Sequence, residues 1–136
     1  MAWPIGLPLE EYHWIDGSWE KPAFRGQVCT DGSGGYWSSD PELRRCGWAI
    51  VQVEEGTPRS DWKWVACPLV GMMQTVPRAE LMAALVTILY TVGPLEAFTD
   101  HLNIVKVFQE GSWATALAGA NGDLWQQVKQ SVDNNQ

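Results

Sequence analysis

Two short strand-like runs of this chain end in the same dipeptide, and this echo constrains the fold more than any other feature. Residues 28–31 and 97–100 both close on a Thr-Asp pair, which leaves Asp31 and Asp100 at the ends of the two runs. Between them, a helix-like segment carries Glu80 near its start. Acidic residues at the carboxyl ends of strands face the loops where α/β proteins carry out chemistry.

Placed side by side, the two strands and the helix would bring Asp31, Glu80 and Asp100 to one spot. Like charges at short range repel and shift one another's pKa values, so folding alone gives no reason to gather them. A bound divalent cation would offset the repulsion and so give a reason for the three acids to lie together.

Each acid also has an ordinary structural explanation. Asp31 precedes a glycine and suits a turn, Glu80 suits the first turn of a helix, and Asp100 could cap a helix that begins at Leu102. For any one residue the ordinary explanation is the stronger. For the three together we favour a metal site, because all three explanations would otherwise have to coincide.

Apolar patterning predicts an α/β domain that begins with three strands. The connections between these strands are short, which favours an antiparallel meander. The second strand alternates apolar residues on both faces, as in a strand covered on both sides. The predicted strands are residues 27–31, 46–53 and 62–67.

A helix and a fourth strand follow the meander. Apolar residues recur at helical spacing from Leu81 to Val92, with Pro77 in the first turn and Gly93-Pro94 as the end signal. The fourth strand, residues 95–100, completes a strand–helix–strand crossover and so lies parallel to an earlier strand. If that partner is the first strand, the two Thr-Asp pairs become neighbours.

We divide the chain into three parts. Residues 1–26 form an irregular, proline-containing lead-in, which either packs aromatic side chains onto the domain or is a remnant of a longer reading frame. Residues 27–132 form the domain, with shorter helices at 102–108 and 124–128 and a small, flexible segment between them. Asp123 is a natural N-cap of the last helix. Residues 133–136 read as a polar tail.

Composition limits the function classes. The net charge of −7 counts against tight nucleic-acid binding by the chain alone, although a substrate held partly through metal ions stays possible. No apolar stretch is long enough to span a bilayer, and the first residues do not read as a signal peptide. The three cysteines read as buried reduced thiols, which favours an intracellular compartment (cytoplasm or nucleus).

Four segments resemble motifs of one enzyme family. They are, in chain order, Thr30-Asp31-Gly32-Ser33, Arg78-Ala79-Glu80-Leu81-Met82-Ala83-Ala84, Thr99-Asp100 and Asn121-Gly122-Asp123-Leu124-Trp125. The first three resemble, in order and at plausible spacing, the first three catalytic motifs of type 1 ribonuclease H. The fourth is similar to the start of a late helix in that family, and the resemblance covers residues 27 to about 132.

The resemblance implies a mixed five-stranded sheet with helices on both faces. It also implies an endoribonuclease that cleaves the RNA strand of RNA–DNA hybrids by two-metal hydrolysis. In that scheme Asp31, Glu80 and Asp100 are the catalytic residues and hold Mg²⁺ or Mn²⁺.

The chain departs from the family pattern at its end, since it stops before the family's fifth strand, histidine loop and last helix with a fourth carboxylate. We therefore expect an RNase H-like domain without its last strand and helix, and slow or absent cleavage. An open sheet edge beside the fourth strand would invite self-association. The alternative function is a catalytically impaired module that only binds nucleic acid or protein.

Overall fold

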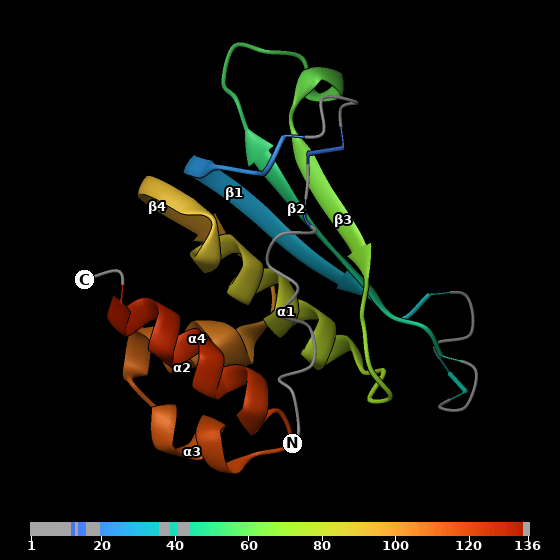
Figure 1. Cartoon of the computed structure of the whole chain (residues 1–136), viewed down its shortest axis with the longest axis vertical. Helices are drawn as coiled ribbons and strands as arrows, with labels where there is room; N and C mark the ends of the chain where they lie inside the picture. The colour runs from blue at the N-terminus through green and yellow to red at the C-terminus, as the bar shows by residue number, and fades with distance from the viewer. Residues whose placement is uncertain (1–11, 13, 16–19, 36–38, 41–43, 135–136) are drawn as a thin grey trace.

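The computed structural model describes residues 12, 14–15, 20–35, 39–40 and 44–134. In this part of the chain, a four-stranded mixed sheet packs against a layer of helices (Figure 1). The elements in chain order are β1 (Phe24–Ser33), β2 (Gly47–Val53), the 3₁₀ turn η2 (Arg59–Asp61), β3 (Trp64–Pro68), α1 (Val76–Leu89), β4 (Thr91–Phe98), α2 (Leu102–Glu110), α3 (Trp113–Ala118) and α4 (Gly122–Asn134).

The strand order is β3-β2-β1-β4. The pairs β1–β2 and β2–β3 are antiparallel, so the predicted meander is confirmed. Strand β4 runs parallel to β1, with Phe98 opposite Cys29. The prediction that the first and fourth strands are adjacent and parallel is therefore also confirmed.

Strand β1 is longer than predicted at both ends. It begins at Phe24, inside the expected lead-in, and it continues past Asp31 to Ser33. Gly32 and Ser33 extend the strand because β2 offers partners as far as Gly47, which lies opposite Ser33. Asp31 is therefore a strand residue and does not lie in a turn.

Helix α1 ends earlier than predicted. It stops at Leu89, and Gly93-Pro94 lies inside β4 instead of ending the helix. Tyr90 makes the transition, since its carbonyl accepts the Phe24 N–H at 2.9 Å and so begins the β1–β4 pairing. A proline, which has no N–H, is tolerated in β4 because this strand lies at the edge of the sheet.

The apolar stripe predicted for α1 is only part of its buried surface. The helix packs against β1 and β2 on one side and against α4 on the other (Figure 1). It therefore buries residues around most of its circumference, including its two charged residues. The buried residues of α1 are Arg78, Ala79, Glu80, Leu81, Met82, Ala83, Leu85, Val86 and Thr87.

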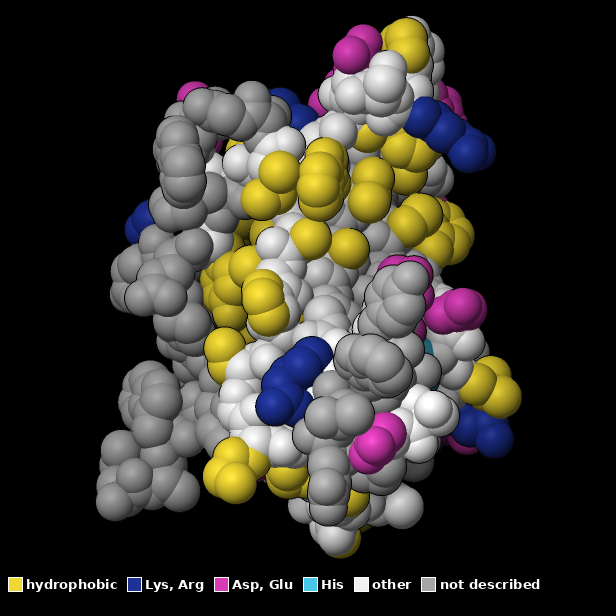
Figure 2. All heavy atoms as spheres, turned by 90° about the vertical axis from the view of Figure 1, so that its right-hand side faces the viewer, with side chains coloured by type: hydrophobic (Ala, Val, Ile, Leu, Met, Phe, Trp, Pro, Cys, Tyr) yellow, Lys and Arg dark blue, Asp and Glu magenta, His cyan; other side chains and the backbone are white. Residues whose placement is uncertain are grey.

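One face of the sheet carries the core and the other is largely open. Trp48 and Ile50 of β2 are buried toward α1, whereas the alternate residues of β2 are only half-buried. On the open face, Cys29, Trp64 and Phe98 are exposed. Figure 2 shows hydrophobic side chains gathered at the surface on the side where β3 lies.

This asymmetry corrects several expectations. In the described part of the chain, β2 is buried on one side and only half-buried on the other, and Cys29 is an exposed thiol and not a buried one. None of the described helices covers the open face, whereas the resemblance implies helices on both faces. The four strands of the described sheet agree with the expected domain that lacks the family's last strand.

The two ends of the chain differ from prediction in detail. Tyr12 and Trp14 of the lead-in are buried. The Tyr12 ring lies 5.2 Å from the Trp48 ring, and the Trp14 ring lies 5.3 Å from the Phe24 ring. Most of the lead-in falls outside the described residues, and so do the last two residues. Helix α4 continues to Asn134, two residues beyond the predicted end of the domain.

The segment expected to be flexible contains the short helix α3, in which Trp113 packs edge-on against Trp125. Among the described residues, none of the helices combines the length and the apolar character that a membrane span requires.

The contact between β1 and α1 generates a prediction. A Cβ atom on Gly32 would lie 3.0 Å from the Glu80 backbone nitrogen and 3.2 Å from the Ala79 Cβ. We expect Gly32→Ala to lower the free energy of unfolding by about 1–3 kcal/mol, because the helix must move away from the strand. Urea denaturation measures this change.

Gly47→Ala is the matched control. Its Cβ would meet only the Cys67 carbonyl oxygen, at an ordinary 3.4 Å. Equal urea midpoints for the two variants would contradict the close approach of α1 to β1 at Gly32.

Candidate metal centre

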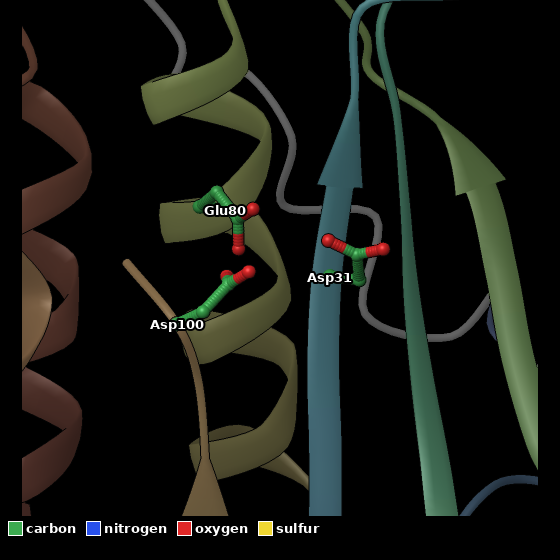
Figure 3. Close-up of side chains that lie close together, drawn as sticks. All are labelled: Asp31, Glu80 and Asp100. Carbon is green, nitrogen blue, oxygen red and sulfur yellow. The ribbon is translucent and has the colours of Figure 1, made fainter. Parts of the chain in front are cut away.

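Three carboxylates from three segments of the chain lie together at one edge of the sheet. Asp31 belongs to β1, Glu80 belongs to α1, and Asp100 follows the end of β4. One oxygen from each of the three lies within 4.8 Å of the other two. Figure 3 shows the Glu80 and Asp100 carboxylates turned toward each other, with Asp31 beside them on its strand.

The parallel pairing of β1 with β4 explains why the two aspartates meet. Cys29 lies opposite Phe98, and each aspartate comes two residues later in its own segment. Parallel strands run in step, so the same offset brings both carboxylates to the same edge of the sheet.

Glu80 reaches the cluster because α1 approaches β1 at Gly32. The Gly32 N–H donates to Glu80 Oε1 at 3.0 Å and also to Asp31 Oδ1 at 2.9 Å. One backbone donor therefore orients two of the three carboxylates. Helix α1 begins at Val76 with Thr75 as its N-cap, so Glu80 lies just beyond the first turn in which we predicted it.

The environment of Glu80 disfavours its negative charge. Only 4% of its surface is exposed, and this burial raises the pKa of the carboxyl above its ordinary value. The hydrogen bond from Gly32 lowers the pKa, and the nearby charges of Asp31 and Asp100 raise it further. Burial and like charge together outweigh the single donor.

The second carboxylate oxygen of Glu80 has no hydrogen-bond donor among the described residues. This oxygen, Oε2, is buried. A buried acceptor without a donor is costly, and a cation at the cluster would provide the missing partner. Asp31 and Asp100 are exposed, so the cluster is open to solvent on that side. Hard oxygen ligands of this kind fit Mg²⁺ or Mn²⁺.

The ordinary explanations for the three acids do not hold in the structure. Asp31 pairs with Ala49 within the sheet and lies outside any turn. The N-cap of α2 is His101, so Asp100 is not the capping residue. Glu80 lies beyond the first helical turn. His101 itself is half-buried.

One ion pair between α1 and α4 escaped the sequence analysis. Arg78 is 1% exposed, and its guanidinium binds both carboxylate oxygens of Asp123, at 2.9 and 2.6 Å. This hydrogen bonding lowers the pKa of Asp123. Asp123 lies within the first turn of α4 and is not its N-cap. Arg78 and Glu80 are the only charged residues of α1, but the sequence does not show that Arg78 has Asp123 as its partner.

Comparison with known proteins leaves the family open. A scan against protein-family models gives no match, and no curated protein matches the chain. The function must therefore be argued from the geometry of the cluster and from the four motifs.

The burial of Glu80 among like charges generates a prediction for the metal-free chain. Glu80→Gln removes the charge and keeps an oxygen that can accept from Gly32. We expect the variant to be more stable than the wild type at pH 7 without metal, because the unfavourable buried charge is gone. Denaturation in the presence of a chelator measures this difference.

The raised pKa of Glu80 also predicts the direction in which the stability of the chain changes with pH. A raised pKa means that the folded chain takes up a proton more readily than the unfolded chain. Wild-type stability should therefore rise as the pH falls toward the ordinary glutamate pKa, and this contribution should be absent in Glu80→Gln. The control is Glu110→Gln, at an exposed position on α2. A Glu80→Gln variant that is less stable than the wild type at pH 7 would contradict the account.

Proposed function

We propose that this chain is a metal-dependent endoribonuclease that cleaves the RNA strand of RNA–DNA hybrids, with an RNase H-like fold. The observation that carries the proposal is the cluster of Asp31, Glu80 and Asp100 at the edge of a parallel strand pair. The order of the four motifs and their positions on β1, α1, the end of β4 and α4 support the same family.

The buried carboxylate and the two exposed carboxylates have different roles in this proposal. Glu80, which is buried and bonded to Gly32, holds the inner side of the site. The exposed Asp31 and Asp100 hold the outer side, where a phosphodiester can approach. When bound, Mg²⁺ or Mn²⁺ supplies an activated water and stabilises charge on the leaving 3′ oxygen.

The charge of the chain shapes how substrate would bind. With a net charge of −7, the side chains offer little general attraction for phosphates. Binding should therefore be weak and depend on the metal. A site that acts on hybrids must also distinguish RNA from DNA, for which the 2′-hydroxyl is the available feature.

A second candidate is a module of the same fold that binds nucleic acid or protein without cleaving it. Two observations favour it: the cluster formed by the described residues has only three carboxylates, and the chain is acidic. Fewer protein ligands fix two metals less firmly, and imprecise geometry is costly in catalysis.

The test is cleavage of a hybrid whose RNA strand is end-labelled, in Mg²⁺ and in Mn²⁺, beside duplex RNA and duplex DNA of the same sequence. We expect slow, metal-dependent cleavage of the RNA strand in the hybrid alone. Asp100→Asn should reduce the rate about 100-fold or more, because it removes a charged metal ligand.

The outcomes separate the two candidates. Hybrid binding that depends on metal, without any cleavage, would favour the binding module. Cleavage that persists unchanged in Asp100→Asn or in a chelator would contradict a role for the carboxylate cluster.

A further inference from the structure

Arg78 is the largest charged side chain buried in the described part of the chain. Its guanidinium pairs with residues at the start of α4. Its guanidinium donates to both oxygens of Asp123 and also to Asn121 Oδ1, at 3.2 Å. A planar guanidinium paired with a carboxylate through two parallel bonds has little freedom of orientation. The pair therefore fixes the start of α4 against α1.

Arg78 lies close to Glu80 along α1. Arg78 belongs to the first turn of the helix, where its N–H also donates to the Thr75 hydroxyl at 3.3 Å. Glu80 follows two residues later. Residues two apart on a helix do not face each other, so Arg78 reaches α4 while Glu80 reaches Gly32 on β1.

The start of α1 is thus held from two opposite sides. On one side a hydrogen bond from Gly32 holds Glu80. On the other side three hydrogen bonds hold Arg78. Asp123 also satisfies the charge of Arg78, so that the arginine does not need Glu80 as its partner and Glu80 Oε2 stays available for a cation.

We propose that Arg78 and Asp123 are positioning residues for the metal centre: their ion pair holds the first turn of α1 where Glu80 reaches Gly32, Asp31 and Asp100. The inference rests on the proposed function in that Glu80 is taken as a metal ligand. It predicts that loss of the pair displaces Glu80 even when the chain stays folded.

The first test needs no metal. The Gly32 amide resonance in a nitrogen–proton NMR spectrum reports the hydrogen bond from Gly32 to Glu80, and Glu80→Gln gives the reference for a changed acceptor. We expect Asp123→Asn and Arg78→Lys to shift this resonance, because both lose the two-bond pairing. Asn121→Ala removes only one bond and should shift it less in the same direction.

Val128→Ala is the matched control. Val128 is a fully buried residue of α4 that lies more than one helical turn beyond Asp123. The substitution loosens α4 by creating a cavity but leaves Arg78 and Asp123 intact. The Gly32 resonance should stay in place in this variant although its stability falls.

The second test is Mn²⁺ affinity, measured by calorimetry on variants that are folded at the temperature used. We expect Asp123→Asn and Arg78→Ala to weaken binding about tenfold, as is usual when the residues that hold a metal ligand are changed. Arg78→Lys keeps the charge but loses the two-bond pairing, so its affinity should lie between those of Arg78→Ala and the wild type. Val128→Ala should bind within about twofold of the wild type.

The outcomes keep this inference apart from the proposed function. Wild-type Mn²⁺ binding without hybrid cleavage would overturn the nuclease proposal and leave the positioning role intact. An unmoved Gly32 resonance in both Asp123→Asn and Asn121→Ala would overturn the positioning role, whatever the chain cleaves. So would a shift in Val128→Ala as large as the shift in Asp123→Asn.

Discussion

The close approach of α1 to β1 at Gly32 determines where the three carboxylates lie. No side chain fits between the strand and the backbone of Glu80, so the helix rests on the glycine itself. That contact lets one N–H donate to both Asp31 and Glu80. The parallel pairing of β1 with β4 then brings Asp100 to the same edge. The position of the cluster thus follows from the backbone geometry of β1, β4 and α1.

This arrangement is unfavourable unless a cation is bound. A buried glutamate faces two further acids, and one of its oxygens has no donor among the described residues. The surrounding structure compensates, since α1 is buried between the sheet and α4 and its arginine is fully paired with Asp123. A fold that holds like charges together in this way is typical of a functional site, and this supports the nuclease proposal.

Much of the frame could be predicted from sequence, and the reasons for the failures are specific. The strand–helix–strand crossover predicted that the fourth strand is parallel to an earlier one, as β4 is to β1. Because both strands lead into a Thr-Asp pair, Asp31 and Asp100 could then be predicted to lie near each other. Gly93-Pro94 misled, because an edge strand tolerates a proline that would also end a helix. The Arg78–Asp123 pair joins residues 45 positions apart, which no local pattern can reveal. The exposed face of the sheet was missed for the same reason, since burial depends on what packs above a strand.

Calorimetric titration with Mn²⁺ shows whether Asp31, Glu80 and Asp100 bind a divalent cation together. We expect weak but measurable binding by the wild type and binding at least about tenfold weaker by Asp31→Asn. Asp61→Asn, which changes an exposed acid of the η2 turn, should bind like the wild type. Equal Mn²⁺ affinity in the wild type and in Asp31→Asn would contradict the account.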